Sequence, residues 1–152
     1  MRIFKEVTQR NLEFIVNHGD GRIRQDTYDA YEALIGNDAA KVILVSIESE
    51  RGRMLAMSAS ILEGKKSMHN ITLTHTDYRR KGLGSLTLAM RLSILTGYSF
   101  ETIVASDNVA SNRLVSRVGL RQTGSKELTR KKGEETYEAL VYNKCDCIKC
   151  EV

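Results

Sequence analysis

The residues best suited to chemistry lie in the stretch DYRRKGLGSLTLAMRL, residues 77–92. It places three basic residues directly before two glycines and a run without helix breakers: Arg79, Arg80, Lys81, Gly82 and Gly84. A helix that starts after this turn leaves its first backbone N–H groups unpaired. The helix dipole, the basic side chains and the glycines, which let an anion approach the main chain, would together suit a pyrophosphate. The alternative is a glycine-containing turn with solubilising basic side chains.

The surrounding pattern predicts an α/β (α+β) chain in the order β-α-α-β-β-β-α-β-α-β-β, a mixed sheet with helices on both faces. Strands are expected at residues 2–7, 41–50, 54–63, 67–76, 101–106, 120–130 and 136–144. Helices are expected at 9–18 after a Thr8 cap, from Asp26 or Thr27 to 35, at 84–97, and from an Asp107 or Asn108 cap to 118. Helix 84–97 is apolar nearly all round, which predicts a buried helix.

The glycine spacing and the order of elements narrow the kind of anion site. No G-x-x-x-x-G-K-[ST] loop is present, and three antiparallel strands before the turn are wrong for a Rossmann unit. A second motif, NVASNRLVSRVGL at 108–120, predicts a helix that is capped by Asn108 and ends at Gly119.

Together, these residues resemble the GNAT N-acetyltransferase superfamily, whose acyl-CoA signature [QR]-x-x-G-x-[GA] is matched by Arg79, Gly82 and Gly84. The second motif is similar to the family's Asn-led helix, with Leu120 where phenylalanine is usual. The resemblance covers residues 1–144 and implies one acyl-CoA-binding domain. It also implies a mostly antiparallel sheet of six to seven strands, flanked by about four helices.

The same resemblance implies where acetyl-CoA binds as the acyl donor. The backbone amides of the glycine turn would hold its pyrophosphate, namely Arg80, Lys81, Gly82, Leu83, Gly84 and Ser85, with Arg79 beside them. The main chain of Leu73 and Thr74 would pair with the pantetheine arm, and Asn108 would contact the arm from the other side. The strands at 67–76 and 101–106 would splay apart around the thioester, whose carbonyl a backbone N–H near Thr74 would polarise.

Acetyl transfer also calls for a general base, because an amine must lose a proton before it attacks. The expected splay offers no carboxylate: its side chains are Asn70, Thr72, Thr74, Thr102, Val104 and Ser106. Ser106 could order a water relay, while Glu63 and Glu101 at strand ends are minor candidates for the base. Val115 occupies the position of the family's usual tyrosine acid, and Tyr137 or Tyr142 are alternatives that core packing explains as well. The histidines His18, His69 and His75 are expected to pack or to cap.

Three functions follow from these residues. The first is direct acetyl transfer from acetyl-CoA to a primary amine of a protein, peptide or small molecule. The second is a CoA-binding protein that has lost catalysis and acts as a regulator or interaction module. The third, nucleic-acid binding by the late basic residues, ranks last because few aromatic residues are available for stacking. The acceptor stays open: Asp20, Asp26 and Asp29 could receive a cationic amine or could form an ordinary acidic surface.

Composition sets the remaining expectations. The 152 residues are 41% hydrophobic and 28% charged with a net charge of +4, which suits one globular domain without a membrane span. The start of the chain lacks the apolar core of a secretory signal, so a cytoplasmic setting is expected. The three cysteines, Cys145, Cys147 and Cys150, lie in a tail at 145–152 and form either reduced thiols or part of a zinc site. A homodimer is left open.

Overall fold

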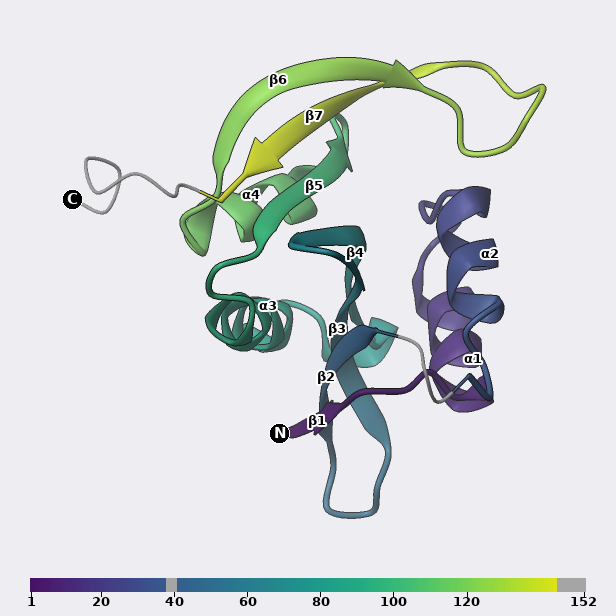
Figure 1. Cartoon of the computed structure of the whole chain (residues 1–152), viewed down its shortest axis with the longest axis vertical. Helices are drawn as coiled ribbons and strands as arrows, with labels where there is room; N and C mark the ends of the chain where they lie inside the picture. Colours follow the sequence, from purple (N-terminus) through teal and green to yellow (C-terminus); the bar gives the residue numbers. More distant parts are fainter. Residues whose placement is uncertain (38–40, 145–152) are drawn as a thin grey trace.

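The computed structural model describes residues 1–37 and 41–144, which form one sheet with helices on both faces (Figure 1). The seven strands of these residues run in the order β1-β2-β3-β4-β5-β7-β6. Their bounds are β1 (Arg2–Phe4), β2 (Val42–Glu48), β3 (Met54–Glu63), β4 (Lys66–Thr74), β5 (Ser99–Ala105), β6 (Arg121–Leu128) and β7 (Tyr137–Asn143). All neighbouring strands are antiparallel except β4 and β5. The expected mixed, mostly antiparallel sheet and its order of elements are confirmed.

Within residues 1–37 and 41–144, four α-helices cover the two faces of the sheet, and each face has its own apolar core (Figure 1). They are α1 (Gln9–His18), α2 (Gln25–Glu32), α3 (Leu83–Ile94) and α4 (Val109–Arg117). On one face, Leu12 and Ile15 of α1 and Tyr31 of α2 pack against β2, β3 and β4. On the other face, Leu88 of α3 and Val115 of α4 pack with apolar side chains of β2, β5 and β7.

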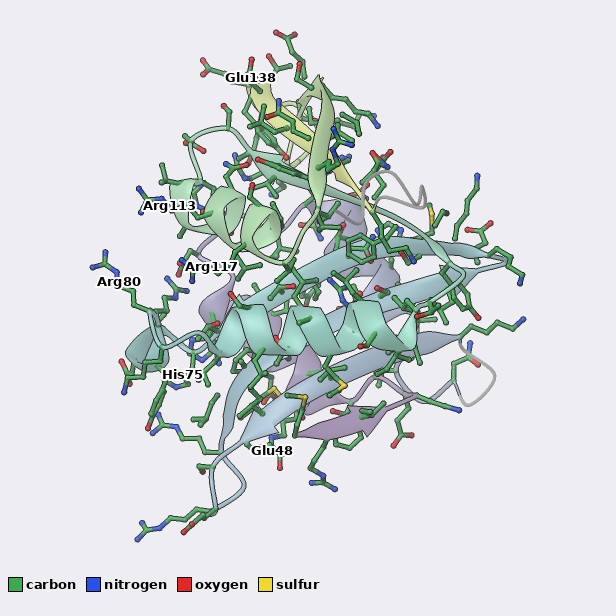
Figure 2. All side chains as sticks on the ribbon, turned by 90° about the vertical axis from the view of Figure 1, so that its left-hand side faces the viewer. Glu48, His75, Arg80, Arg113, Arg117 and Glu138 are labelled. Atoms are coloured by element: carbon green, nitrogen blue, oxygen red, sulfur yellow. The ribbon has the colours of Figure 1, made fainter. Side chains whose placement is uncertain are left out.

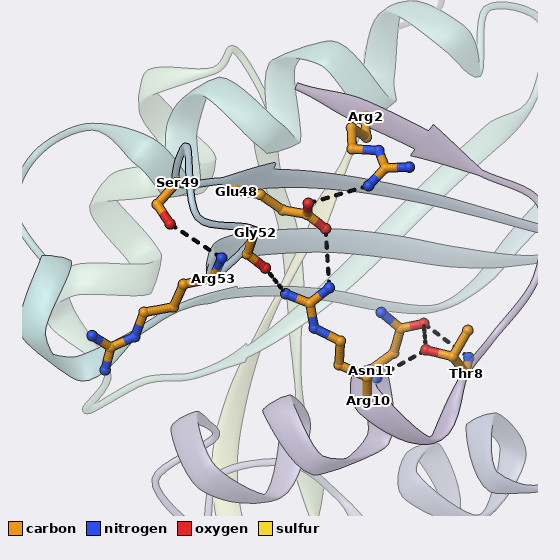
Figure 3. Close-up of polar contacts among 8 residues, drawn as sticks. All are labelled: Arg2, Thr8, Arg10, Asn11, Glu48, Ser49, Gly52 and Arg53. Atoms are coloured by element: carbon orange, nitrogen blue, oxygen red, sulfur yellow. Dashed lines mark hydrogen bonds and ion pairs between the residues drawn. The ribbon is translucent and has the colours of Figure 1, made fainter.

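Helix α1 starts where the sequence predicts, because Thr8 and Asn11 form a reciprocal cap (Figure 3). The Thr8 hydroxyl accepts from the Asn11 amide at 3.3 Å, while the Asn11 side chain accepts from the Thr8 amide at 2.9 Å. Arg10 then reaches the β2–β3 hairpin, where it contacts the Gly52 carbonyl and pairs with Glu48 at 3.3 Å. The cap and the Arg10 contacts fix the N-terminal end of α1 against the sheet.

Helix α3 differs from the expectation of a fully buried helix. Its buried residues are Gly84, Thr87, Leu88 and Arg91, which form one stripe against the sheet. Leu86 and Met90 on the opposite side are 51% and 37% exposed. An apolar composition therefore did not decide burial, because only one face of α3 meets strands. The helix also ends at Ile94 rather than at Gly97, and α2 begins at Gln25 rather than at Asp26 or Thr27.

Strand β4 carries a bulge that α2 holds in place. His69 and Asn70 lie opposite the single residue Ser60, at a register shift where His69 has a φ of 48°. The fully buried Tyr31 hydroxyl donates to the His69 carbonyl at 2.7 Å, and His69 Nδ1 lies 3.2 Å from the Thr27 hydroxyl. The bulge is therefore tied to α2 through both backbone and side chain.

Because the fully buried Tyr31 hydroxyl donates to the His69 carbonyl, we expect Tyr31→Phe to lower the free energy of unfolding by about 1–2 kcal/mol. Urea denaturation monitored by circular dichroism measures this change. Tyr28→Phe on the same helix removes a half-buried hydroxyl that contacts the Glu32 side chain and not the bulge, so this control should shift the midpoint less than Tyr31→Phe. An equal midpoint for Tyr31→Phe and the wild type would show that α2 does not anchor the bulge.

Candidate functional site

The turn before α3 presents a row of backbone N–H groups. Arg80 and Gly82 both have positive φ, 64° and 79°, and Gly82 is the N-cap of α3 without a side-chain cap. Among the described residues, the amides from Arg80 to Ser85 have no hydrogen-bond partner. Successive free amides at a helix N-terminus form a concave anion site, here called the amide cradle (residues 80–85). The positive φ of Gly82 is why glycine is needed there.

Gly84 has a different role from the expected one. A Cβ at this position would lie 2.8 Å from Leu114 Cδ1 and 3.2 Å from Thr74 Oγ1, so the side-chain position of Gly84 faces the protein interior. Gly84 thus lets α3 pack closely on β4 and α4, whereas it was expected to clear space for the anion. The second glycine of the turn acts through packing, and Gly82 acts through conformation.

The signature arginine Arg79 joins the amide cradle to the end of α1. Its Nη1 pairs with Asp20 at 2.5 Å, and its Nη2 donates to the His18 carbonyl at 3.0 Å. Its positive charge is therefore engaged within the chain. Arg80 is exposed, and the Lys81 ammonium lies 5.4 Å from the centroid of the Tyr78 ring. These two residues leave the larger share of positive charge for a bound anion.

Strands β4 and β5 separate almost as soon as they meet. Their ladder consists of the pairs Lys66–Ser99 and Ser67–Phe100. At the next step the Asn70 side chain bridges the strands, because its Nδ2 donates to the Glu101 carbonyl at 2.6 Å. This bridge is the apex of an opening between the two strands, here called the splay.

Beyond the apex, β4 directs alternate backbone groups into the splay. The His75 amide donates to the Leu55 carbonyl of β3 at 2.8 Å, and Leu73 is in register with Met57. Backbone groups alternate between the two edges of a strand, so Leu73 turns its own toward β3, while Thr72 and Thr74 turn theirs toward the splay. The edge that faces the splay therefore consists of Thr72 and Thr74, whereas Leu73 and Thr74 were expected. The Thr74 carbonyl on this edge accepts from Arg79 Nε at 3.4 Å.

Asn108 and its neighbours bind one another at the start of α4. Asn108 caps the helix by accepting from the Ser111 amide at 3.3 Å. Asn112 donates to the carbonyls of Ala105 and Asn108 at 3.0 and 2.9 Å, and it accepts from the Tyr142 hydroxyl at 2.8 Å. The end of β5 and the start of α4 are thus fixed together. Sequence reasoning did not single out Asn112, although an amide one turn after a cap is a signal for such a bond.

Ser106 lies at the rim of a hollow of about 610 Å³ between α4 and β7. The same hollow is lined by Asn112, Tyr142, Arg113 and Arg117. Figure 2 shows Arg113 and Arg117 on the same side of the molecule as Arg80 of the amide cradle. These α4 arginines place positive charge on the same side of the molecule as the cradle, and the sequence analysis did not assign them to the site.

Val115 packs in the core between α4 and the sheet, where it is 4% exposed. An aliphatic side chain in this place cannot donate a proton. Of the two carboxylates considered as bases, Glu63 ends β3 opposite Lys66, away from the splay. Glu101 borders the apex through its carbonyl, and its carboxylate lies 3.5 Å from Lys126.

His18, at the end of α1, and His75, directly after β4, pack against each other. His75 caps a short 3₁₀ turn by accepting from the Asp77 amide at 3.1 Å, and its ring lies 4.1 Å from that of His18. His18 accepts from the Thr76 amide at 3.2 Å. Burial, with the nearby His75 and Arg79, lowers the pKa of His18, which keeps this acceptor neutral near pH 7.

Comparisons with known proteins identify this arrangement. No family model matches the chain, and no curated protein matches it by sequence. Among solved structures, a variant of the spermidine N-acetyltransferase from Vibrio cholerae superposes with a TM-score of 0.68 at 14% identity, over 94% of each chain. The ribosomal-protein-alanine N-acetyltransferase from Brucella melitensis gives 0.67 at 15% identity, over 95% of this chain and 99% of that one. The chain has the GNAT fold.

Within this GNAT fold, the described residues contain no group of His, Cys, Asp and Glu side chains that could hold a metal ion. None of the helices in the described ranges is both long and apolar enough to cross a membrane. Cys145, Cys147 and Cys150 lie outside the described residues.

The packing of Gly84 yields a direct test. We expect Gly84→Ala to destabilise the protein by about 1–3 kcal/mol, because the added methyl group must displace Leu114 or Thr74. Gly124→Ala is the matched control, since nothing lies within 4 Å of its Cβ and its φ is ordinary. Thermal and urea denaturation measure both variants. Equal stabilities would contradict the close approach of α3 to β4.

Proposed function

We propose that this protein is an acetyl-CoA-dependent N-acetyltransferase that transfers the acetyl group directly to a primary amine. The observation that carries the proposal is the amide cradle, a set of free backbone N–H groups at a helix N-terminus beside the splay of β4 and β5. An anion grip next to an open strand edge suits a donor with a pyrophosphate at one end and a reactive thioester at the other.

The donor would bind along one continuous path. The amides of residues 80–85 would bind the pyrophosphate, with Arg80 and Lys81 supplying whole charges. The pantetheine arm would pair with the backbone groups of Thr72 and with the Thr74 amide, like an added strand. Coenzyme A carries a further phosphate on its ribose, for which Arg113 and Arg117 supply positive charge on the same side of the molecule (Figure 2).

The reaction needs few groups from the protein once both substrates are positioned. The lone pair of a neutral amine forms a bond to the thioester carbonyl carbon, the C–S bond breaks, and the electron pair leaves on sulfur. The amine proton passes to water or to a carboxylate, for which Glu101 at the apex is the candidate. A thiol with a pKa of about 8.5 leaves as a thiolate at modest cost, so the absence of an acid at Val115 does not prevent transfer.

The buried Val115 also favours a second function, that of a CoA-binding protein without turnover. Calorimetric titration with acetyl-CoA and thiol release with a panel of primary amines separate the two functions. For the enzyme we expect micromolar binding and release that depends on the amine, above the hydrolysis seen without one. Binding without amine-dependent release would support the second function, and absence of binding would contradict both.

A negative charge placed in the amide cradle tests the donor site without disturbing the fold. We expect Ser85→Asp to weaken acetyl-CoA binding about tenfold or more, because its carboxylate competes with the pyrophosphate for the same amides. The carboxylate is favourable at a helix N-terminus, so stability should be retained or rise by about 0.3–1 kcal/mol. Ser85→Asn matches the size without the charge and should bind within about threefold of the wild type. Unchanged affinity in folded Ser85→Asp would show that the cradle does not hold the donor.

A further inference from the structure

Arg91 is the most deeply buried cation of the described residues, and it lies beneath the apex of the splay. It is on the inner stripe of α3 and is 1% exposed. Its guanidinium donates to the Ala59 carbonyl and to the Ser60 hydroxyl at 3.0 Å, with longer contacts of 3.4 Å to Asn70 Oδ1 and 3.5 Å to Thr72 Oγ1. It also lies 5.0 Å from the centroid of the Phe100 ring of β5. A single side chain thus contacts β3, β4 and β5 where the splay opens.

The neighbours of Arg91 accept hydrogen bonds from its Nη1 and Nη2 but do not neutralise its charge. They are neutral carbonyl, hydroxyl and amide oxygens, and no carboxylate of the described residues forms an ion pair with it. Its Nε has no partner within the described residues. Burial lowers the pKa of Arg91 to about 10, so it stays charged near pH 7. Burying an unpaired charge opposes folding, which makes a purely structural purpose a poor explanation.

The other titratable groups around the apex leave this charge in place. Tyr31 lies on the opposite face of the sheet, and burial raises the pKa of its hydroxyl, which therefore stays neutral. His69 faces Thr27 of α2. Glu101 of β5 turns its carbonyl to Asn70, while its carboxylate pairs with Lys126 of β6. Arg91 thus supplies the positive charge beneath the apex.

We propose that Arg91 stabilises the negative charge that develops on the sulfur of coenzyme A during transfer, in place of the missing proton donor at Val115. The proposal rests on the proposed function. A pantetheine arm that starts at the amide cradle and follows Thr74 and Thr72 runs toward Asn70, where the strands close. Its sulfur would then lie on one side of the Asn70 and Thr72 side chains, which the Arg91 guanidinium contacts from the other side. As the C–S bond breaks, the electron pair on sulfur meets a fixed positive charge in a site of low polarity.

The pKa of the thiol of bound coenzyme A measures the effect of this charge without any turnover. An apolar site alone raises the pKa of a thiol, whereas a nearby cation lowers it. We expect the thiol of CoA bound to the wild type to titrate about one pH unit below its ordinary value of about 8.5. The ultraviolet absorbance of the thiolate measures this titration, with the complex of desulfo-CoA as the blank. A bound thiol with an ordinary or raised pKa would overturn the inference.

Two substitutions separate the effect of the Arg91 charge from the effect of its hydrogen bonds and packing. Arg91→Gln removes the charge and keeps a donor for Ala59 and Ser60, whereas Arg91→Lys keeps the charge. In Arg91→Gln we expect the thiol pKa to rise by about one unit and kcat to fall about tenfold, with the KM for acetyl-CoA within about twofold. Arg91→Lys should retain the lowered thiol pKa and most of kcat. The dissociation constant of desulfo-CoA for both variants should lie within about twofold of the wild-type value. If Arg91 only supported the structure of the site, this constant would rise in the variants.

Controls distinguish an effect of Arg91 itself from an effect of losing any positive charge or of misfolding. Arg2→Gln removes an exposed charge paired with Glu48 on the edge strand and should change neither thiol pKa nor kcat. If Arg91→Gln does not fold, the wild-type titration and folded Arg91→Lys decide the question: both must show the lowered pKa. A folded Arg91→Gln protein with the wild-type thiol pKa would overturn the inference alone. Failure of the wild type to bind CoA would overturn the proposed function as well.

Discussion

The separation of β4 from β5 is the constraint on which the rest of the structure depends. Two parallel strands normally continue to pair, since every unpaired N–H and C=O group in a sheet interior must find another partner. Here pairing stops after Ser67 and Phe100, and the Asn70 side chain takes over one of the lost bonds. The backbone groups of Thr72 and Thr74 face the opening, where the Thr74 carbonyl accepts from Arg79 Nε. The opening is thus part of the folded sheet.

Several distant segments maintain this opening. The bulge at His69 and Asn70 bends β4 and is fixed by Tyr31 from α2. From the other face, Arg91 of α3 holds Asn70 and Thr72 in a buried polar layer. The amide cradle follows directly, because Gly84 brings the start of α3 against Thr74. The anion grip and the open strand edge are therefore positioned by the same helix.

The basic residues near the site divide into two groups once their partners are known. Arg79 is bound to Asp20, and Arg22 pairs with Asp107 across the loops that follow α1 and β5. These arginines join loops and contribute little free charge. Arg80, Arg113 and Arg117 lie together on one side of the molecule (Figure 2). A sequence treats all of these residues alike, and only their neighbours separate the structural charges from those available to a ligand.

The sequence by itself determined the order of strands and helices, the Thr8 and Asn108 caps, and the glycine turn before α3. These features are local, since turn residues, caps and hydrophobic periodicity act over a few residues. Tertiary structure decided which face of α3 is buried, that Thr72 replaces Leu73 at the free edge, and that Gly84 serves packing. It also decided that Arg91 is buried with no counter-charge from the part of the chain that the structure describes. Such features depend on register, on a bulge and on neighbours many residues away, so no local pattern encodes them.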